Sequence, residues 1–132
     1  MLKLQRKLNL IVYLCKDWDE SYGGHFGLYK QDVEKKRAGE LIKEIPMGFN
    51  KAVIFDTTQN SWHGLSQEVN CPNNQYRKSM AVYYLTTPPQ GVDPRNRALF
   101  SPTVEQQEDL SILELIEKRA DFEKSKEVYT KK

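Results

Sequence analysis

The sequence has few cysteines, no long hydrophobic run and almost no net charge, and each shortage excludes a class of protein. Its two cysteines, Cys15 and Cys71, are too few and too far apart for a disulfide framework or a zinc-binding spacing. Twenty basic residues against eighteen acidic ones leave a formal net charge of +2, which argues against nucleic acid as a partner. The longest apolar run, residues 8–15, is far shorter than a membrane span. We therefore expect a cytoplasmic protein with reduced thiols and no membrane partner.

Short strands are the main elements that the sequence predicts. The chain has 132 residues, 39% of them hydrophobic, which is the size of one domain with one core. Runs rich in β-branched and aromatic residues alternate with polar turns such as "KDWDESYGG", and this pattern favours an all-β sandwich or barrel. The expected strands are residues 7–15, 25–29, 41–46, 51–57, 62–65 and 77–87. The charged stretch "DVEKKRAGE" is expected to be a solvated loop.

The character of the sequence changes after Pro88 and Pro89. Residues 90–132 are expected to form a linker and a charged C-terminal helix, in which Ser111 and Glu114 have the spacing of a capping box. The narrow apolar stripe of this helix consists of Leu113, Ile116 and Ala120.

The alternating directions of side chains along two of the strands predict an apolar pocket with a few polar groups. The residues that share a face are Asn9, Ile11 and Tyr13 on the first strand, and Arg77, Ser79, Ala81 and Tyr83 on the last. If both faces line the inside of a small barrel, they form an apolar cavity with a few polar groups, as small-molecule sites do. An inward-facing Arg77 then needs an anionic partner, because an unpaired charge in a dry interior costs on the order of several kcal/mol. A ligand carboxylate, bound by the guanidinium and the Ser79 hydroxyl, meets that need.

Four stretches occur in an order and spacing that point to a known family. They are "RKLNLIVYL", "KDWDESYGG", "FNKAVIFDTTQNSWHG" and "RKSMAVYYL". From about residue 6 to residue 87 the chain resembles the Fe(II)- and 2-oxoglutarate-dependent dioxygenases, in particular the prolyl 4-hydroxylase branch. The resemblance implies a mainly β fold, the double-stranded β-helix (jelly-roll, cupin-like), with residues 1–89 as the C-terminal part of the dioxygenase domain.

The resemblance also assigns roles to individual residues. It implies that His63 is the distal ligand of the iron and that Arg77 pairs with the distal carboxylate of 2-oxoglutarate. Ser79 completes an Arg-x-Ser form of that carboxylate clamp, and Tyr13 lies within reach of the same carboxylate. The cofactors implied are Fe(II), 2-oxoglutarate as co-substrate and ascorbate as reductant. The catalytic residues themselves are not assigned.

The chain departs from the family pattern at the iron. The family holds its metal with two histidines and one carboxylate, and the first two ligands form a His-x-Asp or His-x-Glu pair upstream of "RKLNLIVYL". The few residues there include no His, Asp or Glu. Two readings stay open: the chain is the C-terminal part of a longer oxygenase with Met1 internal, or it is a shortened relative that no longer binds iron in the family way. In either case the chain alone is expected to be inactive.

Other residues allow simpler interpretations. His25, which follows Gly23 and Gly24, and Asp56 are the candidates for a replacement metal ligand, although Asp56 also suits the start of a turn. Trp18 and Trp62 are expected to pack in the core or at the rim of the site as aromatic side chains. The stretch "HGLS" does not fit a nucleophile elbow, which excludes a hydrolase of that type.

The function expected by resemblance is a dioxygenase that couples decarboxylation of 2-oxoglutarate to hydroxylation of a C–H bond. Its partners are then 2-oxoglutarate, O₂ and a protein or amino-acid substrate, with a prolyl side chain as the first candidate. The alternative is a non-catalytic jelly-roll module that binds a carboxylate ligand or a protein partner through the same cavity.

Overall fold

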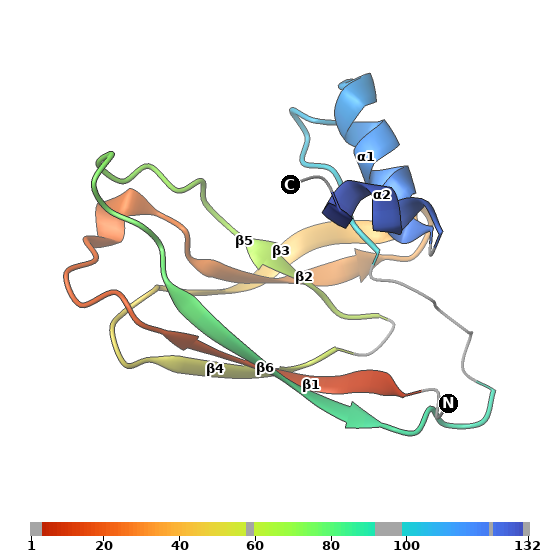
Figure 1. The fold of residues 1–132 in the computed structure, drawn as a ribbon, viewed down its shortest axis with the longest axis horizontal. Coiled ribbons are helices and arrows are strands. Elements are labelled where there is room, and N and C mark those ends of the chain that lie inside the picture. Colours follow the sequence, from red (N-terminus) through yellow and green to blue (C-terminus); the bar gives the residue numbers. More distant parts are fainter. Residues whose placement is uncertain (1–3, 58–59, 92–98, 122, 131–132) are drawn as a thin grey trace. The chain divides into compact units, whose positions relative to one another are not determined.

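Strands dominate the part of the chain that the structure, a computed structural model, describes: residues 4–57, 60–91, 99–121 and 123–130. The chain divides into two units, Met1–Pro89 with all the described strands and Gln90–Lys132 with two helices (Figure 1). In order, the elements are β1 Gln5–Tyr13, the 3-10 helix η1 Glu20–Tyr22, β2 Phe26–Asp32, β3 Arg37–Ile45, β4 Ala52–Asp56, β5 Trp62–Leu65, β6 Ser79–Thr86, α1 Leu110–Ala120 and α2 Lys124–Thr130.

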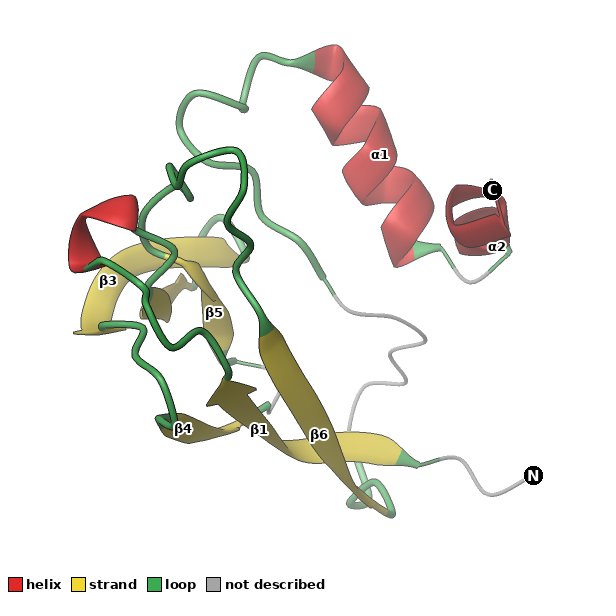
Figure 2. Ribbon diagram, turned by 60° about the vertical axis from the view of Figure 1, so that its left-hand side comes forward, coloured by secondary structure: helices red, strands yellow, loops and turns green. Residues whose placement is uncertain are grey.

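The strands of the first unit form two antiparallel three-stranded sheets. One has the order β4-β1-β6 and the other β3-β2-β5, as Figures 1 and 2 show. The sheets face each other, because the ring centroids of Phe26 on β2 and Phe55 on β4 are 4.7 Å apart. This arrangement confirms the expected fold class, mainly β and jelly-roll-like.

The core lies between the two sheets and follows the period of two. On β4, Val53 and Phe55 are buried whereas Ile54 between them is 63% exposed, as the alternating directions of strand side chains require. The buried hydrophobic residues are Tyr13, Cys15, Phe26, Met47, Val53 and Phe55.

The structure moves several predicted boundaries. β1 ends at Tyr13, two residues before the predicted end, and β6 begins at Ser79, so that Arg77 precedes the strand. The prediction of a loop for "DVEKKRAGE" was wrong in part, because β3 begins at Arg37 and pairs with β2. β3 is an outer strand with mostly exposed side chains, a position in which charged residues are well tolerated.

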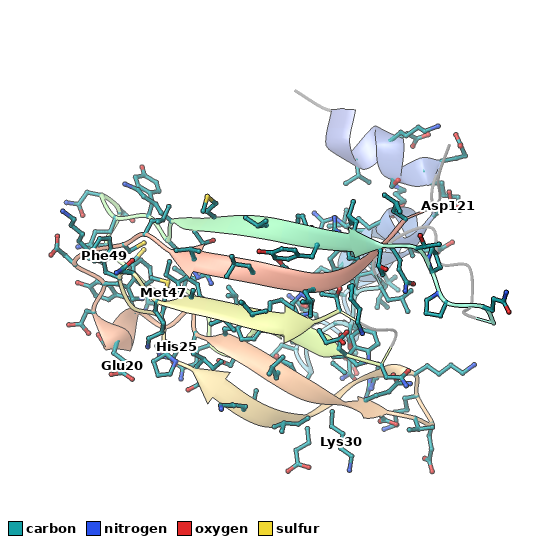
Figure 3. All side chains as sticks on the ribbon, turned by 90° about the horizontal axis from the view of Figure 1, so that it is seen from below. Glu20, His25, Lys30, Met47, Phe49 and Asp121 are labelled. Atoms are coloured by element: carbon teal, nitrogen blue, oxygen red, sulfur yellow. The ribbon has the colours of Figure 1, made fainter. Side chains whose placement is uncertain are left out.

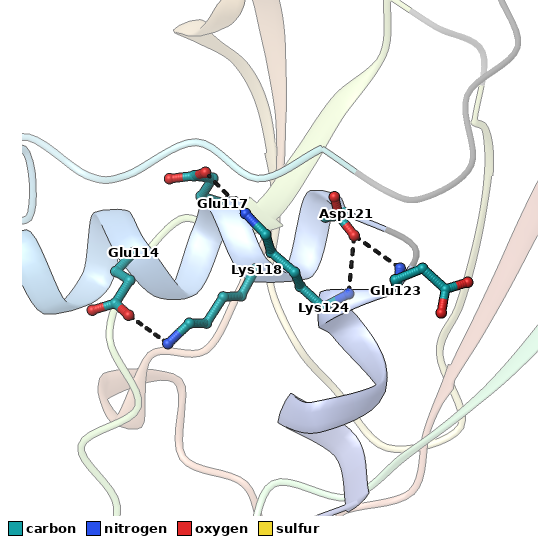
Figure 4. Close-up of polar contacts among 6 residues, drawn as sticks. All are labelled: Glu114, Glu117, Lys118, Asp121, Glu123 and Lys124. Atoms are coloured by element: carbon teal, nitrogen blue, oxygen red, sulfur yellow. Dashed lines mark hydrogen bonds and ion pairs between the residues drawn. The ribbon is translucent and has the colours of Figure 1, made fainter.

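The second unit also differs from the prediction. The N-cap of α1 is Asp109, not Ser111, because the Asp109 carboxylate accepts hydrogen bonds from the backbone N–H groups of Ser111 and Ile112. The predicted single helix is interrupted at Asp121, which ends α1 and accepts from the N–H groups of Glu123 and Lys124 at the start of α2. Figure 4 shows the contacts of Asp121 beside the ion pairs Glu114–Lys118 and Glu117–Lys124.

β6 is an outer strand that exposes apolar side chains on both faces. Tyr83, on the face turned toward the other sheet, is 45% exposed, and Tyr84, on the opposite face, is 49% exposed. No helix among the residues described is long and apolar enough to cross a membrane.

Candidate functional site: the inner face of β1

The inner face of β1 carries two enclosed polar side chains. Asn9 is 6% exposed, Tyr13 is fully buried, and Ile11 between them is half-buried. In the antiparallel register, Tyr13 lies directly opposite Ser79 of β6. The structure therefore brings the predicted residues Tyr13 and Ser79 to the same level of one sheet.

Arg77 lies beside Tyr13, just before β6 begins. Its guanidinium carbon is 5.3 Å from the centroid of the Tyr13 ring, and its Nε donates a 3.0 Å hydrogen bond to the carbonyl oxygen of Gly24. Arg77 is half-buried, and among the residues described it takes part in no salt bridge. Because a guanidinium has five N–H donors, this placement leaves donors for an anionic ligand.

The Tyr13 hydroxyl is buried and makes no hydrogen bond of ordinary geometry within the described part of the chain. The Arg77 guanidinium is nevertheless close enough to interact with it. Burial raises the pKa of Tyr13 above its ordinary value, while the nearby positive charge of Arg77 opposes that rise. A neutral hydroxyl beside a guanidinium is a donor pair suited to one carboxylate.

A turn of two glycines precedes β2, and the second of them, Gly24, makes room for Arg77. Gly23 and Gly24 have φ angles of 67° and 71°, a region that L-residues rarely adopt. A Cβ on Gly24 would lie 3.0 Å from Cδ and 3.2 Å from Nε of Arg77. The absence of a side chain at Gly24 therefore lets Arg77 pass close to this turn. The Trp18 indole N–H donates a 3.1 Å hydrogen bond to the Gly23 carbonyl oxygen in the same turn.

His63 lies on β5 and turns its ring to the aromatic core. The ring centroid is 4.4 Å from that of Phe55 and 6.0 Å from that of Phe26, although the residue as a whole is exposed to solvent. Partial burial, and to a lesser extent the positive charge of Arg6, lower the pKa of His63. This shift favours the neutral imidazole, which is the form that binds metals.

His63 and Arg77 contact the inner side of the same sheet. His63 packs on Phe55 of β4, Arg77 lies over Tyr13 of β1, and Phe55 pairs with Asn9 on the inner face of β1. The two residues that the resemblance assigns to metal and co-substrate thus pack against the same face of this sheet, His63 at the level of Asn9 and Arg77 at the level of Tyr13.

The two candidate replacement ligands have other contacts. His25 is 3% exposed, and its Nδ1 accepts a 3.2 Å hydrogen bond from the N–H of Met47; Figure 3 labels both residues. Asp56 ends β4 and forms a 2.7 Å salt bridge with Lys7. No three His, Cys, Asp or Glu side chains gather into a metal site within the described part of the chain.

A cavity of about 400 Å³ lies outside the predicted site. Its walls include Leu14, Cys15, Trp18, Tyr76 and Lys78, and none of the predicted site residues lines it. The Cys15 thiol is engaged by the backbone, since its Sγ accepts a 2.9 Å hydrogen bond from the N–H of Lys78. Trp18 lines this cavity and also packs against the core, as expected of a packing or rim aromatic.

Sequence reasoning left two residues of this site without a role. Asn9 was expected on the inner face, and the signal that could have singled it out is an amide in an otherwise apolar strand. Gly24 could have been found from the Gly23-Gly24 pair, because consecutive glycines indicate positive φ angles or close approach of another group.

Comparison with known proteins identifies the family of the chain. The 2OG-Fe(II) oxygenase superfamily matches residues 2–91, more than half of the chain. The chain belongs to the 2OG-Fe(II) oxygenase superfamily. The match includes every strand of the first unit and the residues Tyr13, His63, Arg77 and Ser79, so the family resemblance is confirmed.

Curated relatives within the superfamily are prolyl hydroxylases by name. The chain is 28% identical over 92 residues to "Prolyl 3-hydroxylase OGFOD1" of Xenopus laevis, a match that covers 67% of this chain and 17% of the relative. It is 30% identical over 91 residues to the protein of that name from Mus musculus, with 67% and 16% covered. The chain therefore spans about one sixth of the length of these relatives.

The superfamily implies 2-oxoglutarate and Fe(II), and the described residues fit the two differently. The buried, unpartnered Tyr13 hydroxyl beside Arg77 fits a carboxylate of 2-oxoglutarate. For the metal, the described residues offer the His63 imidazole without a cluster of further ligands, whereas the family site needs three. They fit the co-substrate and do not by themselves fit the iron.

Proposed function

We propose that this chain is the co-substrate-binding part of a 2OG-Fe(II) dioxygenase that hydroxylates a prolyl side chain of a protein. The reaction consumes R–H, 2-oxoglutarate and O₂, and yields R–OH, succinate and CO₂. The observation that carries the proposal is the enclosed, unpartnered Tyr13 hydroxyl at the side of the Arg77 guanidinium.

The residues of the chain bind and orient the co-substrate. Arg77 and Tyr13 donate hydrogen bonds to the distal carboxylate, and Ser79 adds its hydroxyl from the position opposite Tyr13. Tyr13 is buried and Arg77 is half-buried, so the carboxylate is partly removed from water and its interaction with Arg77 is strengthened, whereas Ser79 is exposed. The co-substrate is thereby aimed along the inner face of β1 toward His63.

His63 is the metal ligand that the chain contributes in this proposal. Its neutral imidazole is held against Phe55 and Phe26, which fixes the ring plane. Because the described residues supply no complete set of ligands, the chemistry at the metal requires ligands in addition to those of the described site.

The relatives support a prolyl substrate through their names. Those names state hydroxylation at the 3-position, whereas the sequence motifs resemble the prolyl 4-hydroxylases. The product analysis must therefore distinguish 3-hydroxyproline from 4-hydroxyproline.

The test is release of succinate in the presence of Fe(II), ascorbate and 2-oxoglutarate, with and without proline-containing peptides. Since one imidazole holds a labile divalent ion weakly, we expect turnover near background from the 132-residue chain alone. Extension by an upstream segment with a His-x-Asp pair should produce succinate formation that His63→Ala abolishes.

Two outcomes would count against the proposal. Robust turnover by the short chain that depends on His63 would show that residues within it, His25 and Asp56 first, complete the site. Saturable binding of 2-oxoglutarate without any succinate from the extended chain would favour the non-catalytic module.

A further inference from the structure

Asn9 is an enclosed polar side chain that the proposed carboxylate clamp does not use. It is 6% exposed, and its Oδ1 is buried without a hydrogen-bond partner among the described residues. An amide oxygen left unpartnered in a protein interior loses its hydrogen bonds to water and gains none in return. Residues of this kind persist where a ligand, water or ion supplies the missing bond.

The position of Asn9 matches the His63 end of the site. In the register of the sheet, Asn9 lies opposite Phe55 on one side and Tyr83 on the other. The His63 ring lies 4.4 Å from the Phe55 ring. Asn9 and His63 therefore flank the same aromatic side chain.

The clamp residues lie at the other end of the same face. Tyr13 is four positions along β1 from Asn9, which is roughly 13 Å at the rise of a β-strand. Half-buried Ile11 lies between them. The face thus has a polar group at each end and an apolar middle, which is the pattern of a dicarboxylic acid with a hydrocarbon centre.

We propose that Asn9 binds the 2-oxo acid end of 2-oxoglutarate, at the end of the site opposite the Arg77 clamp. This inference rests on the proposed function, since it takes 2-oxoglutarate as the ligand. A side-chain amide can present either its oxygen or its NH₂ group to the same point by rotating about its last bond. With the NH₂ group turned inward, Asn9 donates to an oxygen of that carboxylate.

The experiment compares two ligands by NMR titration of the metal-free chain. 2-Oxoglutarate has both ends, whereas pentanoate has only the carboxylate that the Arg77 clamp takes. Asn9→Leu should weaken 2-oxoglutarate binding about tenfold or more, because a hydrogen bond to a charged group is lost, and should leave pentanoate unchanged. Arg77→Lys, the matched variant at the other end, should weaken both ligands.

Stability distinguishes a ligand-binding role from a structural one. Asn9→Leu replaces an unpartnered amide by an apolar side chain of similar size, so the free energy of unfolding without ligand should be unchanged or higher. Asn9→Asp serves as a second variant; its charge should repel the carboxylate and weaken 2-oxoglutarate more than pentanoate.

The outcomes separate this inference from the proposed function. If the unmodified chain binds neither ligand, the proposed function of the site is wrong and the inference with it. If 2-oxoglutarate binds and Arg77→Lys weakens it while both Asn9 variants bind normally, only the inference is overturned. Equal losses for pentanoate, or a clear loss of stability in Asn9→Leu, would assign Asn9 a structural role instead.

Discussion

Tyr13 links the stability of the first unit to pH. Burial raises the pKa of its hydroxyl above the ordinary value, and Arg77 only partly offsets this. Since the unfolded chain releases that proton at lower pH than the folded chain, the free energy of unfolding holds below about pH 10 and falls as the pH rises above it. We expect Tyr13→Phe to reduce this alkaline loss.

Urea denaturation between about pH 8 and about pH 11 measures the effect. Tyr84→Phe is the control, because Tyr84 is 49% exposed on β6. An alkaline loss of the same size in Tyr13→Phe and in the unmodified chain would show that the Tyr13 hydroxyl is not the group responsible.

For single residues, the sequence predicts which face of a strand a side chain lies on better than it predicts which residues that side chain contacts. The period of two places Tyr13 on the inner face of its strand because alternate side chains share a face, and the structure agrees. The contact of Arg77 with Gly24 joins residues 53 positions apart, and no local pattern encodes such a distance. The packing of His63 on Phe55 likewise requires the two sheets to meet.

The turn formed by Gly23 and Gly24 positions Arg77, so a substitution in this turn should weaken the binding of the co-substrate. In Gly24→Ala the new Cβ would press on the arginine side chain at 3.0 Å, and the φ of 71° would be strained. We expect a loss of about 1–2 kcal/mol in the free energy of unfolding and weaker binding of 2-oxoglutarate, measured by denaturation and titration.

Gly91→Ala is the matched control for this turn. Gly91 has a similar φ of 78°, but an added Cβ would meet nothing within 4 Å. The control should share the backbone strain and keep normal affinity for 2-oxoglutarate. Normal affinity in Gly24→Ala as well would show that the turn does not position Arg77.

Strands were predicted correctly where the burial of one face and the β-propensity of the residues both indicate a strand. β1 and β4 combine β-branched residues with one buried face, and both were expected within two residues of their ends. β3 was missed in part because its charged residues lie on an outer strand, where the partner strand rather than burial fixes the backbone. The cap of α1 was misplaced by two residues because Asp109 and Ser111 are both good N-cap residues.

For the whole molecule, the relation between fold and family is the main result. The superfamily match covers residues 2–91, and this segment folds into two facing sheets whose outer strands include β5 and β6. His63 and the start of the clamp both lie on these outer strands or next to them. The family assignment could be predicted from motif spacing, whereas the position of the site at a sheet edge required the structure.

Arg77 holds 2-oxoglutarate in the proposed site, and calorimetry of 2-oxoglutarate binding tests this directly. The unmodified chain should bind saturably. Arg77→Lys keeps the charge but loses the guanidinium fork, so binding should weaken by about 1–3 kcal/mol, while Arg37→Lys on β3 should bind like the unmodified chain. Equal affinity in Arg77→Lys, or no binding by the unmodified chain, would show that Arg77 does not hold 2-oxoglutarate.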